Sequence, residues 1–220
     1  MPEEYEEYLM ALKTDPSRKF DLKRFRDCTE SDRKACASII MDEVLLNSSI
    51  MVQCANDARI IQCSHPPSNP RHTNFLAHFS VYCETMMIPM FDGEPFDWTC
   101  IEDLGSLLGQ LYTREAIKNA TINKWFEHVQ KFVARSNNEA IKALVAVLKI
   151  VLDRMKSRDI KIFKAYVSQI QSLTNNGQIP TEHAQWTREI LKEHASKPQK
   201  SQTQSPIPAP TQTTGAIKKS

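Results

Sequence analysis

The chain has 220 residues, a formal net charge of +2, and a composition in which 41% of the residues are hydrophobic and 25% are charged. These figures suit one globular domain with a single buried core, and they give no reason to expect stabilisation by disulfides or metal ions. Only five glycines occur, which argues against a β-rich fold with many tight turns and against a glycine-rich phosphate-binding loop.

Neither the apolar segments nor the cysteines indicate a membrane or secreted protein. The apolar stretch at 80–90 is far shorter than the roughly 20 residues of a membrane-spanning helix, so we expect no membrane contact. The first residues are acidic rather than basic and then apolar, so we expect no secretory signal and a cytoplasmic location. Six cysteines lie in the first half of the chain without a Cys-x-x-Cys pair, and we interpret them as free thiols.

One alternative is a metal site around a proline-rich loop. Its ligands would come from five residues that fall close together in the sequence, namely Cys63, His65, His72, His78 and Cys83. Their spacing matches none of the usual structural zinc motifs. We therefore expect no metal and no other cofactor.

Apolar residues at helical spacing predict helices in the first half of the chain. The predicted helices cover residues 5–12, 36–44, 50–63, 75–86 and 101–112. A loop with three prolines at 64–71 separates the third helix from the fourth, which ends at Pro89 and the following turn. Gly105 and Gly109 lie one turn apart in the fifth helix, where small residues would let a neighbouring helix approach closely.

The clearest helix of the second half covers residues 138–156. Its apolar residues recur at intervals of three and four, and they are Ile141, Leu144, Val145, Leu148, Val151, Leu152 and Met155. Val147 and Ile150 widen this apolar face, so we expect the helix to be covered on more than one side at the centre of a stack. Further helices are predicted at 122–133, 160–173 and 181–193.

Helices of this length with short connections are typical of repeat proteins in which neighbours pack antiparallel. We therefore predict an all-α fold, a HEAT/ARM-like right-handed solenoid of antiparallel helix pairs. Residues 1–29 form an acidic helix and a lead-in, and residues 30–195 form the helical-repeat domain. Residues 196–220 are rich in Ser, Thr, Gln, Pro and Lys, a composition that predicts a disordered tail.

The predicted helix at 101–112 carries a familiar pattern. Its residues 104–112 read Leu-Gly-Ser-Leu-Leu-Gly-Gln-Leu-Tyr, and they resemble the FxGELY/F helix of the middle domain of initiation factor 4G, although Gln110 replaces the usual acid. Poly(A)-binding-protein-interacting proteins, the histone stem-loop translation factor and Mextli proteins share this domain. As in that family, a helix, a polar turn and a long apolar helix containing Leu152-Asp153 follow. The resemblance implies a translation scaffold that docks a DEAD-box RNA helicase of the initiation factor 4A type.

Charge is distributed unevenly along the chain. Residues 80–110 contain six acids and no Lys or Arg, whereas residues 111–170 contain twelve basic residues and five acids. Lys142, Lys149 and Lys156 are seven residues apart and share one face of their helix. The candidate RNA-binding residues are Lys124, Lys131, Lys142, Lys149, Arg154, Lys156, Arg158 and Lys161. They either contact RNA phosphates or form an ordinary solvated helix face.

A second candidate surface lies in the acidic segment. Its candidate partner-binding residues are Phe91, Asp92, Glu94, Phe96 and Trp98. Aromatic side chains bordered by acids suit a protein interface, for example with a basic helicase lobe. The alternative is that the same rings cap the core.

The sequence offers no convincing catalytic group. His128 beside Glu127 and His183 beside Glu182 have no evident nucleophilic partner, so we expect neither an enzyme nor a small-molecule substrate. The predicted function is a non-catalytic scaffold in translation or mRNA regulation that binds helicases or other translation factors, and mRNA through its basic face. The alternative is a HEAT-like protein–protein adaptor without RNA binding.

Overall fold

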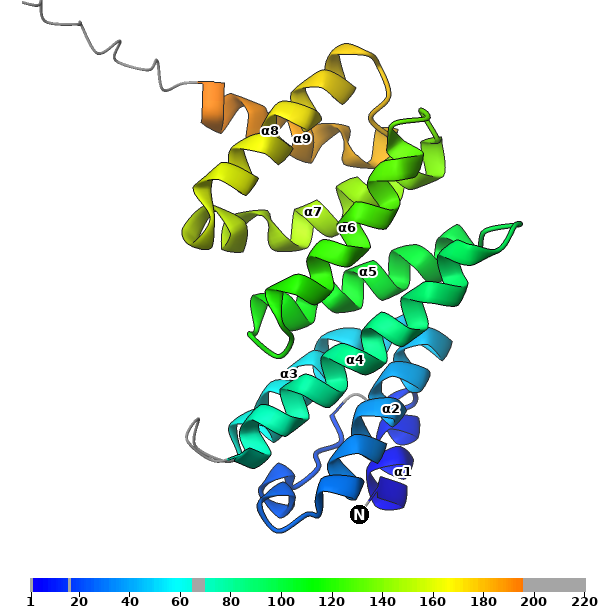
Figure 1. The fold of residues 1–220 in the computed structure, drawn as a ribbon, viewed down its shortest axis with the longest axis vertical. Helices are drawn as coiled ribbons and strands as arrows, with labels where there is room; N and C mark the ends of the chain where they lie inside the picture. Colours follow the sequence, from blue (N-terminus) through cyan, green and yellow to red (C-terminus); the bar gives the residue numbers. More distant parts are fainter. Residues whose placement is uncertain (1, 16, 65–69, 196–220) are drawn as a thin grey trace, which may run out of the picture.

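The structure is a computed structural model that describes residues 2–15, 17–64 and 70–195. Within these residues it contains nine α-helices, three short 3-10 helices and no strand (Figure 1). The predicted all-α fold class is therefore confirmed. The predicted tail at 196–220 lies outside the described residues, as does most of the proline-rich loop.

Most of the helices are longer than their apolar patterns alone indicated, whereas α3 and α9 are each one residue shorter. The α-helices are α1 (Pro2–Leu12), α2 (Glu30–Leu46), α3 (Met51–Cys63), α4 (Pro70–Asp92), α5 (Trp98–Thr113), α6 (Asn119–Val133), α7 (Asn138–Arg158), α8 (Ile160–Asn175) and α9 (Ala184–Ala195), and the 3-10 helices are η1 (Leu22–Arg26), η2 (Ser48–Ile50) and η3 (Thr181–His183). The prediction that α4 ends at Pro89 is wrong, because the helix continues to Asp92. Pro89 lies in the last turn, where its missing N–H costs the helix only one hydrogen bond.

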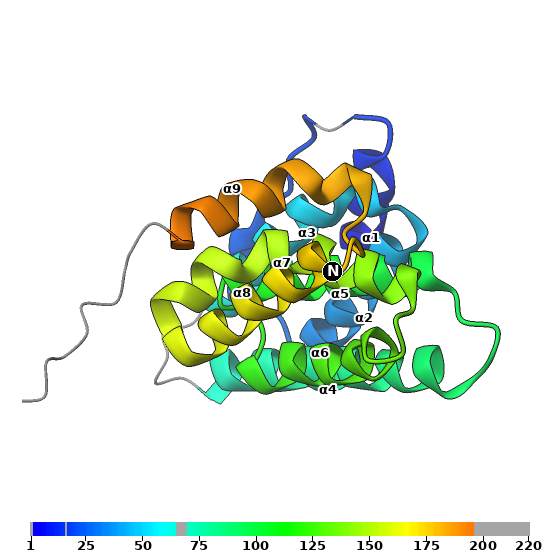
Figure 2. The same ribbon diagram turned by 90° about the horizontal axis from the view of Figure 1, so that it is seen from above.

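The helices stack in two layers. One layer contains α2, α4 and α6, each packed against the next, and the other contains α3, α5 and α7, packed in the same way. Consecutive helices such as α6 and α7 also pack together across the layers. Figure 2 shows α4 and α6 along one side of the molecule and α3 and α9 along the other. This arrangement is that of a helical-repeat solenoid.

The N-terminal helix α1 is part of the same core as the repeats. It packs on α2, and its Tyr5 and Tyr8 are buried. The Tyr5 hydroxyl donates to Asp57 Oδ2 (3.1 Å), and Gln53 Nε2 donates to Asp57 Oδ1 (2.7 Å). Burial raises the pKa of Asp57 to about 6, although these hydrogen bonds act in the opposite direction.

The centre of the stack is the contact between α5 and α7. Gly105 faces the indole of Trp125 and lies so close to it that a Cβ atom would overlap the ring and would come within 2.8 Å of Val147. The Trp125 indole N–H donates to the Ile101 carbonyl (3.1 Å), which fixes the ring against α5. A Cβ atom on Gly109 would meet Val151 at 3.1 Å. The prediction that these glycines permit close helix packing is confirmed.

Three helices end in the same turn, with one residue in the left-handed conformation. After α5, the N–H of Glu115 donates to the Tyr112 carbonyl (3.1 Å) and the N–H of Ala116 donates to the Leu111 carbonyl (2.9 Å). Ser136 and Gly177 occupy the equivalent place after α6 and α8. Glycine is the usual residue there, because a side chain at positive φ is strained. Glu115 has φ 62°, so the chain holds an acidic side chain at a strained position.

We expect Gly105→Ala to destabilise the protein by about 2 kcal/mol, because the added methyl overlaps the Trp125 ring in a packed core. Gly109→Ala is the matched control: it brings the same gain in helix propensity with a milder contact, and we expect a change within about 1 kcal/mol. Chemical unfolding followed by circular dichroism measures both values. Equal effects at the two glycines would contradict the close approach at Gly105.

The buried Asp57 carboxyl makes stability depend on pH. Because its folded pKa is raised, its contribution to stability is fully present below the unfolded pKa of 3.8 and is lost as the pH rises through about 6. We expect Asp57→Asn, which keeps a hydrogen-bond acceptor, to gain up to about 3 kcal/mol relative to the wild type between pH 4 and pH 7. Unfolding curves of both proteins across this range test the prediction, and a difference that does not change with pH would refute it.

Candidate binding surfaces

Helices α3 and α7 bring three arginines together around Glu115, which follows α5. Its Oε1 accepts hydrogen bonds from Arg154 and Arg158, both on α7, and its Oε2 lies 3.4 Å from a terminal nitrogen of Arg59 on α3. Partial burial would raise the pKa of Glu115, but Arg158 and Arg154 hold it below its usual value. The carboxylate therefore stays ionised and joins α3 to α7 at the end of α5.

A fourth arginine, Arg114, directly precedes Glu115 in the chain. Its Nε donates to Asn56 and its Nη1 donates to Gln110, so it is held by neutral partners. We call Arg59, Arg114, Arg154 and Arg158 the arginine cluster. These four guanidinium groups and Glu115 together carry a net charge of +3. The side chains of Arg59, Arg154 and Arg158 are 36%, 31% and 32% exposed, so the cluster is open to solvent.

The predicted lysine stripe on α7 (Lys142, Lys149 and Lys156) faces acids of η3 and α9. The Nζ of Lys142 lies 3.9 Å from a carboxylate oxygen of Glu182 and 4.0 Å from one of Glu102. Lys156 Nζ lies 2.8 Å from Glu193. Two of the three lysines are therefore neutralised within the protein.

The other predicted basic residues are spread over the surface. Lys124 on α6 forms an ion pair with Glu84 on α4, and Lys131 and Lys161 are exposed. Of the eight candidates, Arg154 and Arg158 meet at one carboxylate. Sequence reasoning missed their companions Arg59 and Arg114, because no periodic pattern connects α3 or the end of α5 with α7.

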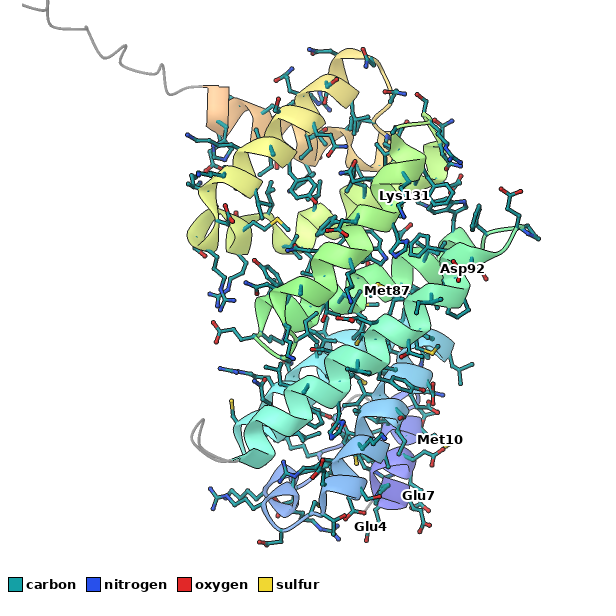
Figure 3. All side chains as sticks on the ribbon, viewed as in Figure 1. Glu4, Glu7, Met10, Met87, Asp92 and Lys131 are labelled. Carbon is teal, nitrogen blue, oxygen red and sulfur yellow. The ribbon has the colours of Figure 1, made fainter. Side chains whose placement is uncertain are left out.

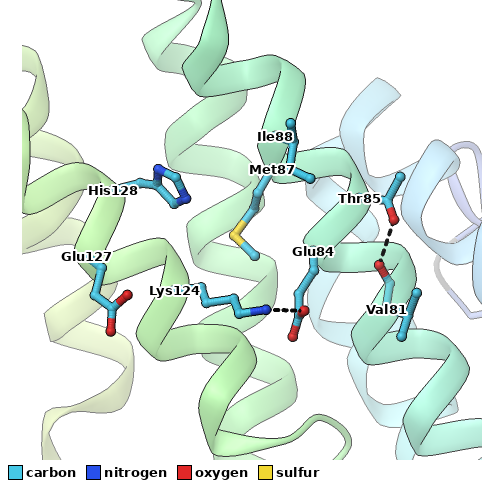
Figure 4. Close-up of a pocket in the computed structure, with 8 residues that line it drawn as sticks. All are labelled: Val81, Glu84, Thr85, Met87, Ile88, Lys124, Glu127 and His128. Atoms are coloured by element: carbon cyan, nitrogen blue, oxygen red, sulfur yellow. Dashed lines mark hydrogen bonds and ion pairs between the residues drawn. The ribbon is translucent and has the colours of Figure 1, made fainter.

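A groove of about 440 Å³ runs between α4 and α6. Its α4 side carries the exposed apolar residues Val81 and Ile88, which are 61% and 56% exposed. Its α6 side carries Lys124, Glu127 and His128 (Figure 4). Burial and nearby Lys131 lower the pKa of His128, so the ring is neutral at pH 7. The groove thus has a polar α6 edge and a mixed α4 edge, on which Val81 and Ile88 lie beside the polar Glu84 and Thr85.

The aromatic residues of the acidic segment point inward. Phe91 is buried and stacks on His128, with ring centroids 4.9 Å apart. Phe96 and Trp98 are half-buried and meet Phe132 edge-on, with centroids 4.8 and 5.3 Å away. These rings cap the core.

The exposed part of this segment is acidic. Asp92 and Glu94 are open to solvent at the end of α4, and Figure 3 shows Asp92 there. We call Asp92, Glu94 and Asp97 the acidic loop. Asp92 lies close enough to His128, which lines the groove, for its charge to oppose the lowering of the His128 pKa. The acidic loop therefore begins beside the groove.

The residues of the alternative metal site do not form a described cluster. Cys63 is exposed, Cys83 is buried, and His78 pairs with Glu30 at 2.9 Å. His65 lies outside the described residues, and so does the side chain of His72. Among the described residues, no group of three or more potential ligands is placed to hold a metal ion. No helix in this part of the chain is long and apolar enough to cross a membrane.

Comparison with protein-family models, with curated proteins and with solved structures found no match for this chain. The described surfaces, together with the motif in α5, are therefore the basis for assigning a function. Two surfaces stand out: the arginine cluster, and the groove with the acidic loop beside it.

We expect Trp98→Ala to lower the free energy of unfolding by about 2 kcal/mol, because it removes a half-buried ring and its edge-to-face contact with Phe132. Glu94→Ala, in the same loop but exposed, should change it by less than about 0.5 kcal/mol. Chemical denaturation of both variants makes the comparison. If Trp98→Ala proved as harmless as Glu94→Ala, the ring would not be capping the core.

Proposed function

We propose that this chain is a cytoplasmic, non-catalytic scaffold in translation or mRNA regulation, of the initiation factor 4G middle-domain type. Two features support the proposal. The helix with the family-like pattern, α5, lies at the centre of the stack and packs on α7. The fold is a row of helix pairs, which exposes long surfaces for docking.

The protein partner in this proposal is a DEAD-box RNA helicase of the initiation factor 4A type. The observation that carries it is the α4–α6 groove with the acidic loop beside it. Val81 and Ile88 supply exposed apolar area there, and Asp92 and Glu94 supply negative charge beside it. An apolar centre with a charged border is the usual composition of a protein interface. The charge favours a basic partner surface and speeds its association.

The alternative function is a HEAT-like protein–protein adaptor without RNA binding. The ion pairs of Lys142 with Glu182 and of Lys156 with Glu193 favour it, because paired lysines are less available to RNA phosphates. A pull-down from cytosolic extract separates the two functions when it is repeated after nuclease treatment. An RNA-binding scaffold loses part of its bound proteins to the nuclease, whereas a pure adaptor keeps them all.

We expect Asp92→Lys with Glu94→Lys to weaken binding to a purified helicase of this type by at least about tenfold, because the reversal places like charges against a basic surface. The matched control is Glu6→Lys with Glu7→Lys. These residues are exposed on α1, far from Asp92 (Figure 3), and the substitution makes the same change in net charge. Binding is measured by surface plasmon resonance with nuclease-treated proteins.

The control should bind like the wild type. An equal loss in both double variants would mean that net charge alone governs the interaction. If the wild-type chain failed to bind the helicase at all, the helicase assignment would be wrong.

A further inference from the structure

We propose that the arginine cluster is the site at which this protein binds a backbone phosphate of single-stranded RNA, and that Glu115 occupies the site until RNA displaces it. This inference rests on the RNA-binding part of the proposed function. It moves that contact away from the lysine stripe, where acids of η3 and α9 already neutralise two of three charges.

The cluster has more hydrogen-bond donors than the described residues use. Each guanidinium carries five N–H groups, whereas the one carboxylate that pairs with Arg59, Arg154 and Arg158 in the described part of the chain offers two oxygens. The Nε–H of Arg154 is buried and has no hydrogen-bond partner there. An additional oxyanion would satisfy donors that Glu115 leaves unused.

Phosphate is the oxyanion that suits this arrangement best. The planar fork of a guanidinium matches two phosphate oxygens, and arginine is the preferred residue for such bidentate contacts. A phosphodiester in a chain needs an open surface through which its neighbours can pass. The cluster is open, because the side chains of Arg59, Arg154 and Arg158 are each about one-third exposed.

The basic surface continues beyond the cluster along the chain. Lys118 and Lys161 are exposed, and Arg158 reaches toward the former, because its Nη1 donates to Asn119 (3.4 Å). Lys161 follows in the first turn of α8, where Asp159 is occupied in capping the helix N-terminus. The following phosphates of an extended strand would therefore meet further positive charge, which favours a polyanion over an isolated phosphate group.

Glu115 acts as an internal competitor for the site. It occupies the left-handed position where α8 uses Gly177, so the backbone alone does not explain its presence. Its carboxylate holds Arg154 and Arg158 in place while repelling an incoming phosphate. Binding of RNA requires the phosphate to replace the carboxylate at these two guanidinium groups.

Titration of a short fluorescent single-stranded RNA, followed by anisotropy at several salt concentrations, tests the site. We expect Arg154→Gln with Arg158→Gln to raise the Kd about tenfold or more, because charge-assisted hydrogen bonds are lost. The salt slope should become shallower by roughly 0.7 for the lost phosphate contact. Lys142→Gln with Lys156→Gln removes the same number of charges from the lysine stripe and should leave affinity and slope near the wild-type values.

Glu115→Gln separates a binding site from a purely structural ion-pair network. If Glu115 competes with RNA, this variant binds RNA more tightly than the wild type, by several-fold, even where its Tm falls. A lower Tm with unchanged or weaker RNA binding would overturn the proposal. Equal losses in the arginine and lysine double variants would also overturn it, because net charge would then explain the binding.

Two further outcomes keep this inference distinct from the proposed function. A short phosphoserine peptide that bound as tightly as RNA would assign the cluster to phosphorylated proteins and overturn the RNA assignment. If the wild-type chain bound no RNA at low salt, both the RNA site proposed here and the RNA-binding part of the proposed function would be wrong. The helicase measurement, which uses nuclease-treated proteins and the acidic loop, would stand independently of either result.

Discussion

The close packing of α5 against its neighbours is the constraint on which the rest of the structure depends. Gly105 lets the Trp125 indole lie directly against α5, and Gly109 lets Val151 of α7 do the same one turn later. Since α5 and α7 are in such close contact, the residues at their ends are also held together. This contact brings Glu115, just after α5, within reach of the arginines in the last turns of α7. The arginine cluster is therefore a consequence of core packing as much as of charge.

The helices around α7 decide which of its polar residues remain available. On one face of α7, Lys142 pairs with a carboxylate of η3 and Lys156 pairs with one of α9. This face therefore links α7 to two other elements of the solenoid. At its C-terminal end, Arg154 and Arg158 share a single carboxylate with Arg59. The same helix thus has a side on which two of three lysines are paired and an end where arginines outnumber their carboxylate. Surface ion pairs like those of the lysines contribute little stability, and their main effect here is to reduce the positive potential of that side.

The sequence predicted the fold class and the central packing, but only half of the arginine cluster. Apolar residues at helical spacing located α7, and the small residues of α5 indicated a close neighbour, because both signals are local. The partners of a charged side chain depend on which distant helix packs beside it, which explains why the ion pair between Lys142 and Glu182 was not foreseen. Arg59 was overlooked for the same reason. Its helix, α3, comes close to α7 only because both helices pack on α5. Phe96 and Trp98 turn inward because both rings pack against Phe132 of α6. Sequence spacing could not show that this residue lies beside them.

The length of α5 also separates the two proposed surfaces. The acidic loop precedes Trp98 and the arginine cluster surrounds the turn after Thr113, so the 16 residues of α5 lie between them, a distance of about 24 Å at 1.5 Å per residue. Figure 1 shows the loop before α5 and the turn after it at opposite edges of the molecule. The acidic loop lies between α4 and α5, whereas the arginines come from α3, α7 and the turn after α5. At this separation a basic protein and a strand of RNA can bind at the same time without competing for residues, and substitutions at the two surfaces should have additive effects on binding. This arrangement fits the proposed role of a scaffold that brings a helicase to RNA.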